Sequence, residues 1–323
     1  MTTVLPILTR RTTWPRASLT SLGFFCALLT TLTVSIAQEE SPVSLAKDIF
    51  PGAEGSGISS PVNLGGTVFF SAADGTPAPQ ARKLWRSNGE PGGTMEVPNG
   101  WPSPNPTELT VIGDTLYFSA FGNPGGTELW KVEGPAGAAV LVKDINPDPA
   151  GGVLSSMPRD LTDVDGTLFF TAISGDLGRE LWKSNGEAAG TTLVENITPG
   201  RGSTRFSSFV RPVGVDDTLF FVVETETAGV ELWKSDLTTG KTGMVKDIHP
   251  GAASSNPTNL VSFKNLLYFV ADDGVHGREI WRSDGNEDET KMVADINPGS
   301  FILSTPGVSS SSTTCSNSPP MTA

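Results

Sequence analysis

The stretch Glu180-Leu181-Trp182-Lys183-Ser184-Asn185-Gly186 recurs in related forms along the chain and decides the fold. Its tryptophan returns four more times, and successive copies lie 45, 52, 51 and 48 residues apart. A fixed period of this size indicates an array of similar supersecondary units. The five repeat tryptophans are Trp85, Trp130, Trp182, Trp233 and Trp281.

Two further marks keep constant offsets from the tryptophan. An aromatic residue lies 12 positions before it in four units, as Phe118, Phe170, Phe221 and Phe269, and Phe70 lies 15 positions before Trp85. Fourteen positions after it, an Asp or Asn opens an Asp-Ile-x-Pro-Gly phrase, seen most clearly at residues 247–251, and an extra copy occupies residues 48–52. Constant offsets separated by variable spacers indicate rigid strands joined by tolerant surface loops.

Each unit has room for four antiparallel strands. In the third unit we expect them at residues 160–164, 167–173, 179–185 and 191–197, with Asp165-Gly166 as a tight hairpin turn. Four such strands in 45 to 52 residues are typical of a propeller blade. The sequence therefore predicts an all-β protein, a β-propeller of about five four-stranded blades, with the tryptophans and aromatics filling the space between blades.

The chain contains one more strand-like segment than five four-stranded blades need. Residues 43–49 read as a strand and resemble the last strand of a unit, as do residues 292–297. In a closed ring both would claim the outer edge of the final blade. Our hypothesis is a closed five-bladed ring with one of these strands outside it or added as a fifth strand. The rival is an open array that is part of a longer one.

With these motifs in view, the chain resembles the secreted bacterial repeat proteins named after their Glu-Leu-Trp-x-x-Asp-Gly-Thr motif. The resemblance covers residues 44–299 and rests on several offsets that agree in several copies. The first unit departs from it, because Lys83 replaces the glutamate and Asn99-Gly100 replaces the Asp-Ile phrase. The resemblance implies export and a repetitive β architecture, and it implies no enzymatic activity.

The ends of the chain read differently from the repeat. Residues 1–37 have the pattern of a cleaved signal peptide, with a basic start, an apolar run and a small-x-small site at Ser35-Ile36-Ala37; an uncleaved anchor is the alternative. Residues 38–43 form a short polar lead. Residues 300–323 are rich in Ser, Thr and Pro and read as a disordered tail, which also fits a truncated or frame-shifted gene product.

The net charge of the chain limits the classes of partner that we expect. The chain has 22 basic and 35 acidic residues, and removal of the three signal-peptide arginines leaves 19 against 35, a net charge of −16. Nucleic acid and anionic lipid need clustered Lys and Arg, so neither is expected as a partner. No membrane span is expected after signal cleavage, and one cysteine, Cys315, would remain, so no internal disulfide is expected.

Catalytic residues are hard to find in the repeat. His249 and His276 occupy variable loop positions and read as loop residues, and no Ser-His-Asp set or Cys/His metal spacing can be built. Tyr117 and Tyr268 stand at a repeated aromatic strand position, which favours a core role over that of a glycosidase nucleophile. We therefore expect no enzyme; a glycoside hydrolase that uses a carboxylate pair is the alternative.

Several residues are candidates for binding. Asp272 and Asp273 are candidate metal ligands for calcium, although turn carboxylates more often bond nearby backbone amides. Trp101, in a loop outside the repeat, is a candidate for stacking on a ligand. A repeated glutamate two positions before tryptophan could line a channel or bond a basic partner or backbone amides; its copies are Glu128, Glu180, Glu231 and Glu279.

These features favour a secreted or cell-surface binding module. Rigid blades would display variable loops to an extracellular protein or a polysaccharide, without an expected cofactor other than calcium. The alternatives are the propeller hydrolase and a purely structural envelope or matrix protein.

Overall fold

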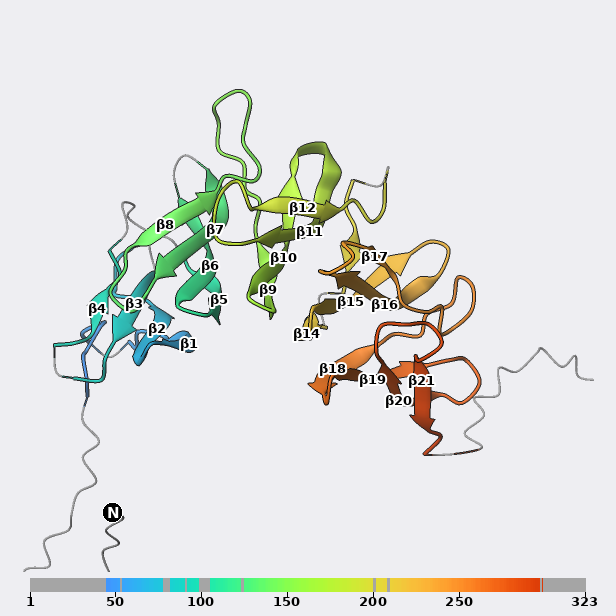
Figure 1. Cartoon of the computed structure of the whole chain (residues 1–323). Coiled ribbons are helices and arrows are strands. Elements are labelled where there is room, and N and C mark those ends of the chain that lie inside the picture. The colour runs from blue at the N-terminus through green and yellow to red at the C-terminus, as the bar shows by residue number, and fades with distance from the viewer. Residues whose placement is uncertain are drawn as a thin grey trace, which may run out of the picture. The chain divides into compact units, whose positions relative to one another are not determined.

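The computed structural model describes residues 45–298, except residues 53, 78–81, 91, 99–104, 123–124, 200–201, 208–209 and 297. The expected signal peptide, the tail and Trp101 therefore lie outside the described residues. Over the described range the chain folds into five consecutive antiparallel sheets with almost no helix, which confirms the all-β prediction (Figure 1). No helix in this range is long and apolar enough to cross a membrane.

Each sheet is a meander of neighbouring strands. The first contains β1 (Ser59–Leu64), β2 (Thr67–Ala72), β3 (Lys83–Ser87) and β4 (Met95–Glu96). The second contains β5 (Thr107–Ile112), β6 (Thr115–Gly122), β7 (Gly126–Glu133) and β8 (Ala139–Lys143). The third contains β9 (Arg159–Val164), β10 (Thr167–Ser174), β11 (Gly178–Ser184) and β12 (Thr192–Glu195), with a 3-10 turn η1 (Gly175–Leu177) between β10 and β11.

The last two sheets follow the same plan. The fourth contains β13 (Arg205–Phe206), β14 (Val213–Val215), β15 (Thr218–Thr225), β16 (Gly229–Asp236) and β17 (Thr242–Met244). Both β13 and β14 pair with β15, so its first strand is split in two and the sheet otherwise matches the rest. The fifth contains β18 (Thr258–Phe263), β19 (Leu266–Asp272), β20 (Arg278–Ser283) and β21 (Lys291–Ala294).

Strand register explains the aromatic mark in the sequence. The second and third strands of each sheet form a hairpin in which Phe170 is the cross-strand partner of Trp182, and Phe221 that of Trp233. The same pairing joins Phe70 to Trp85, Phe118 to Trp130 and Phe269 to Trp281. Directly opposed side chains on one face contact each other, so a constant offset in the sequence becomes a constant aromatic pair in space.

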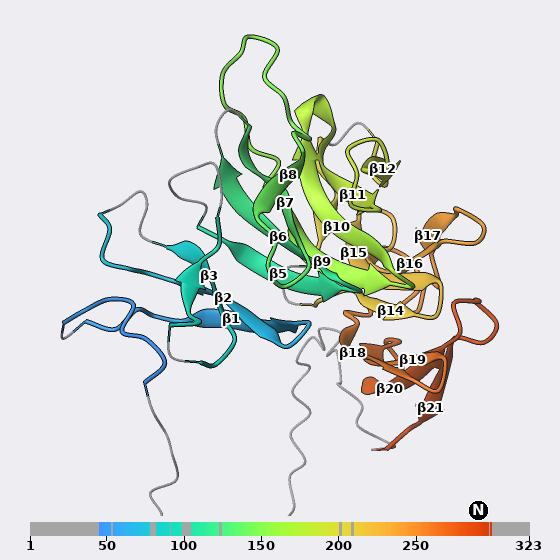
Figure 2. The same cartoon turned by 60° about the vertical axis from the view of Figure 1, so that its left-hand side comes forward.

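Successive sheets are joined by apolar cores that have a direction. In the second sheet, Ile112, Tyr117, Leu129, Val142 and Ile145 pack together against Phe170 and Trp182 of the third. We call these five positions the forward face of a sheet, and the side that carries the tryptophan its indole face. The fourth sheet repeats the contact with the fifth through Val215, Phe220, Leu232, Val245 and Ile248. The first strands also follow one another, in the order β1, β5, β9, β14, β18 (Figures 1 and 2).

A buried glutamate links each of these cores to the next loop. Glu128 is fully buried, and its carboxylate accepts hydrogen bonds from the backbone N–H of Ile145 (3.0 Å) and from Ser156, through both its N–H (2.8 Å) and its hydroxyl (2.5 Å). Glu180 and Glu231 make equivalent contacts. These glutamates therefore bond backbone amides and a hydroxyl. This agrees with the structural role considered from the sequence and not with a channel-lining role.

The strand predicted over residues 43–49 is wrong for residues 45–49, which form no strand; residues 43–44 lie outside the described range. Instead, the buried side chain of Ile49 packs against Phe70, Ala72 and Trp85, as Ile145 packs against Trp182. In the later units the isoleucine also lies beyond its strand, because the glutamate carboxylate takes its backbone N–H. The Asp-Ile phrase therefore contributes one inserted side chain instead of a strand.

The expected closed ring is also not observed. Among the described residues no hydrogen bond, ion pair or apolar core joins the first sheet to the fifth. The forward face of the fifth sheet is exposed, with Phe263 at 55% and Ile296 at 67%, while the isoleucine site on the first sheet is already filled by Ile49. The described residues therefore show no closure between the first and fifth sheets, and membership of a longer array stays a prediction.

Candidate functional site

A groove between the third and fourth sheets exposes part of one repeat tryptophan. Its volume is about 390 Å³, and it is lined by Ile197, Thr198, Pro199, Thr225, Glu226, Thr227, Ala228, Trp233 and Met244. Trp233 is half-buried, whereas the four other repeat tryptophans are only 6–7% exposed. The groove thus combines an aromatic wall, aliphatic side chains and several hydroxyl groups.

Trp233 lacks a lysine contact that two other repeat tryptophans have. Lys143, 13 positions after Trp130, places its ammonium group 5.8 Å from the ring centre of Trp182 and donates a hydrogen bond to the carbonyl of Thr191. Lys47 covers Trp85 in the same way, at 5.3 Å, and bonds the carbonyl of Thr94. The residue at this position before Trp233 is Glu195, which supplies no cation for the ring.

The groove walls are held by strand pairing and loop bonds. Met244 on β17 is the cross-strand partner of Trp233 and is 37% exposed. On the loop between β15 and β16, the backbone N–H of Ala228 donates to the hydroxyl of Thr225 (3.2 Å). The hydroxyls of Thr198 and Thr204 lie 3.0 Å apart. A preformed apolar wall with a few polar groups is the usual composition of a small-ligand site.

A second polar site lies where β5 and β9 adjoin. The backbone N–H of Asp160 donates to the carboxylate of Glu108 (3.1 Å), and Arg211 approaches the same carboxylate at 3.9 Å. Burial, together with the negative charge of Glu108, raises the pKa of Asp160. The Asp160 carboxylate also accepts a hydrogen bond from the hydroxyl of Thr171 (3.3 Å). Two carboxylates with different environments are the arrangement that acid–base chemistry uses.

The candidate metal ligands lie at the end of β19, which Asp272 closes, and in the turn after it, which contains Asp273. Asp272 accepts a hydrogen bond from the N–H of Gly274, and Asp273 accepts bonds from the N–H groups of Val275 and His276. The Nδ1 atom of His276 lies 2.7 Å from the Asp273 carboxylate, and this hydrogen bond raises the pKa of the imidazole. Within the described part of the chain, no group of three or more His, Cys, Asp or Glu side chains is arranged to hold a metal.

The other sequence candidates occupy the core or its edge. Tyr117 is buried in the core between the second and third sheets, and this burial raises the pKa of its phenol. Tyr268 is half-buried at the uncovered end of the fifth sheet. The ring of His249 lies against Gly274, and its Nδ1 is buried without a hydrogen-bond partner among the described residues.

Sequence reasoning missed both sites. The repeat tryptophans were all assigned to the core, and Glu195 does not by itself mark Trp233 as exposed, because Pro98 also replaces the lysine before Trp130, which is only 6% exposed. Glu108 and Asp160 each lie 22 positions before their tryptophans, Trp130 and Trp182. Equal offsets place them at equivalent points of adjacent first strands, which is why they meet.

Comparison with known proteins adds little to this picture. No protein-family model matches the chain, and no curated protein matches it. A structure from a study of two prolyl endopeptidases aligns with a TM-score of 0.48 and 12% identity, over 73% of this chain and 36% of that one. A putative TolB from Agrobacterium tumefaciens aligns with a TM-score of 0.41 and 12% identity, over 73% of this chain and 79% of that one.

An acylaminoacyl peptidase from Pyrococcus horikoshii aligns similarly, with a TM-score of 0.42 and 12% identity over 74% of this chain and 38% of that one. The chain spans about a third of the length of the first two aligned structures, the second being a puromycin hydrolase variant. With every TM-score below 0.5, these likenesses transfer neither activity nor substrate to this chain.

Proposed function

We propose that this protein is a secreted or cell-surface binding module of the β-propeller type, and that it binds polysaccharide in the groove beside Trp233. The observation that carries the proposal is the partly exposed indole ring of Trp233, which lines the groove among hydroxyl-bearing side chains. A sugar ring has an apolar C–H face and a polar edge. An aromatic wall flanked by hydroxyls matches both, and a rigid sheet holds the wall in place at little entropic cost.

The acidic surface and the fixed sheets support the same proposal. The net charge of −13 disfavours anionic partners such as nucleic acid and is compatible with a neutral or basic glycan. Buried Glu180 accepts hydrogen bonds from the N–H groups of Ile197 and Thr204 and so fixes the loop beside the groove before a ligand arrives. Preorganisation of this kind lowers the free-energy cost of binding.

A panel of soluble polysaccharides, tested by isothermal titration calorimetry on the full chain, tests the proposal. Met244→Glu places a charge beside Trp233, and we expect it to weaken binding at least tenfold, about 1.4 kcal/mol. Leu141→Glu is the matched control, because Leu141 is the cross-strand partner of Trp130 and is 39% exposed, but lies outside the groove. Equal losses in the two variants, or binding to a protein partner only, would contradict the proposal.

A hydrolase is the second candidate function, and Glu108 and Asp160 favour it. Here Asp160, whose pKa is raised, would donate a proton to the leaving group, and Glu108, beside Arg211, would be the second carboxylate of the pair. We expect Asp160→Asn and Glu108→Gln each to abolish release of reducing ends from any glycan that the chain cleaves. Turnover that survives both substitutions would eliminate this pair, and a glycan that is bound but not cleaved would favour the binding module.

A further inference from the structure

The fifth sheet ends in an apolar face that its counterparts bury. Phe263, Ile280 and Val293 are 55%, 40% and 51% exposed. The equivalent residues of the second sheet, Ile112, Leu129 and Val142, are 8%, 0% and 5% exposed, because the third sheet covers them. A contiguous exposed apolar face of this kind marks an interaction site. In the other interfaces, the indole face of the next sheet covers the equivalent residues.

The first sheet offers the matching indole face at the other end. Val68 is 41% exposed, whereas its equivalents Leu116, Leu168, Leu219 and Leu267 are at most 1% exposed beneath the preceding sheet. Trp85 and Phe70 pack against Ile49, and Lys47 lies over the Trp85 ring. On the first sheet, Ile49 therefore fills the isoleucine site, but no preceding sheet covers the remainder of the indole face. On the fifth sheet, no following sheet covers the forward face.

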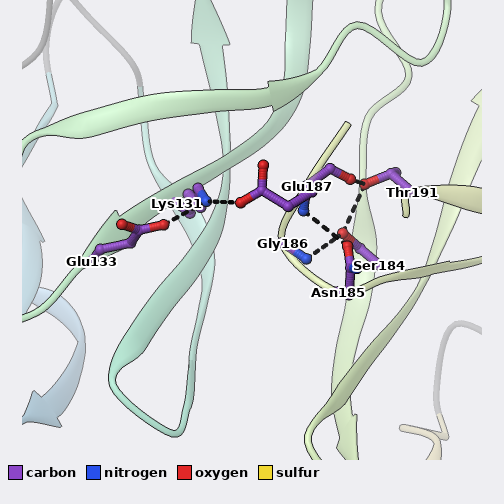
Figure 3. A network of polar contacts seen from close by, with 7 residues as sticks. All are labelled: Lys131, Glu133, Ser184, Asn185, Gly186, Glu187 and Thr191. Carbon is purple, nitrogen blue, oxygen red and sulfur yellow. Dashed lines mark hydrogen bonds and ion pairs between the residues drawn. The ribbon is translucent and has the colours of Figure 1, made fainter. Parts of the chain in front are cut away.

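Charge matches the two ends as well. Between the second and third sheets, Lys131, directly after its tryptophan, pairs at 3.0 Å with Glu187, five positions after the next tryptophan (Figure 3). At the equivalent positions, the fifth sheet carries Arg282 and the first sheet carries Glu90, and both are exposed. The exposed apolar residues and these two opposite charges therefore lie on the same pair of faces.

We propose that the fifth sheet of one chain docks onto the first sheet of a second copy, head to tail, so that Phe263, Ile280 and Val293 cover Val68. Both faces are exposed within one chain, so the cover comes from another molecule. Ile49 keeps its site over Trp85, which leaves Ile296 of the docking copy without a role in the contact. A heterologous contact of this kind propagates, so it produces open chains of copies.

Sedimentation velocity of the full chain over a range of concentrations tests this contact. We expect the wild type to form a concentration-dependent series of oligomers. Val293→Glu and Val68→Glu should each weaken self-association at least tenfold, because each buries a charge in one of the two faces. Val275→Glu is the matched control, since Val275 is 67% exposed and lies in the loop between β19 and β20, outside the five forward-face positions.

Mixing the two variants distinguishes head-to-tail docking from other contacts. The Val293→Glu chain keeps an intact first sheet and the Val68→Glu chain keeps an intact fifth sheet, so we expect the mixture to form a one-to-one dimer and nothing larger. A wild type that stays monomeric overturns the proposal and favours closure of the ring within one chain. Self-association that Val68→Glu leaves intact also overturns it, because the fifth sheet would then bind a different surface.

Charge reversal gives a third measurement on the same contact. Arg282→Glu places two acids opposite each other in the docked pair, and Glu90→Arg places two bases there, so each should weaken association. The double variant restores opposite charges and should recover it. Additive losses in the double variant would contradict the proposed register of the two faces.

Discussion

At the scale of single residues, the buried glutamate two positions before tryptophan fixes the connection from one sheet to the next. Glu128 is fully buried, and its two carboxylate oxygens accept bonds from Ile145 and Ser156, which lie on either side of the connecting loop. Its removal would leave backbone N–H groups buried without acceptors, and that desolvation penalty is larger than the net gain of an ordinary hydrogen bond.

We therefore expect Glu128→Ala to lower the free energy of unfolding by about 2–5 kcal/mol. Urea denaturation monitored by tryptophan fluorescence measures it. Glu187→Ala is the control, because Glu187 has a side chain that is 72% exposed and makes a surface ion pair, so it should change stability by less than about 1 kcal/mol. A similar decrease in the free energy of unfolding in both variants would show that the buried hydrogen bonds of Glu128 stabilise the fold no more than a surface ion pair does.

The same glutamate predicts a pH dependence. Burial raises the pKa of Glu128 to about 7, from an ordinary value of 4.5, against the lowering effect of its hydrogen bonds, and burial also raises the pKa of Glu180 and Glu231. Between these two values the folded chain holds a proton that the unfolded chain has lost, so stability falls as the pH rises from 4.5 to 7. Glu128→Gln should flatten this dependence in urea titrations at pH 5 and pH 7, and an unchanged difference would refute the assignment.

At the scale of the sheet, the position before tryptophan separates covered from uncovered elements. Leu129 on β7 and Ile280 on β20 occupy the same place in their sheets, but Leu129 is fully buried and Ile280 is 40% exposed. Burial and not position determines the cost of truncation, because a cavity forms only where neighbours surround the lost atoms.

We expect Leu129→Ala to destabilise the chain by about 2–5 kcal/mol, and Ile280→Ala by less than about 1 kcal/mol at low protein concentration. Equilibrium unfolding in urea gives both values. If Ile280→Ala costs as much as Leu129→Ala in a dilute monomer, the forward face of the fifth sheet is covered within the chain and the open arrangement is wrong.

The sheets show what a repeat pattern can and cannot predict. The third unit's strands were predicted to within two residues at each end, because alternation and a hairpin turn are local properties of the chain. The predicted strand before Ile49 failed because a repeated phrase marks a repeated contact, which here is a single inserted side chain. Ring closure failed for a related reason: an apolar forward face predicts that a neighbour is needed, but not that one is present. The binding role and export remain predictions.

At the scale of the whole molecule, the units are alike but their interfaces have a direction. The forward faces of the first four sheets meet the indole face of the next sheet, so the array has two different ends. The order of contacts along the chain is therefore also the order that the proposed assembly would continue.

Assembly through folded ends should make thermal stability depend on concentration. Because docking requires both folded faces, we expect the melting temperature of the wild type to rise with protein concentration, by mass action. Differential scanning calorimetry at several concentrations measures the shift. The melting temperature of Val293→Glu should be nearly independent of concentration, and a shift that persists in this variant would mean that other surfaces cause it.

The insertion of Ile49 over Trp85 has a consequence for any shortened version of this protein. The folded part begins before its first strand, since residues 45–50 shield an indole that β1 to β4 leave bare on that side. A fragment that starts at β1 would keep every hydrogen-bonded strand but expose the Trp85 ring to solvent. We expect its tryptophan fluorescence to shift to longer wavelength and the fragment to aggregate more readily.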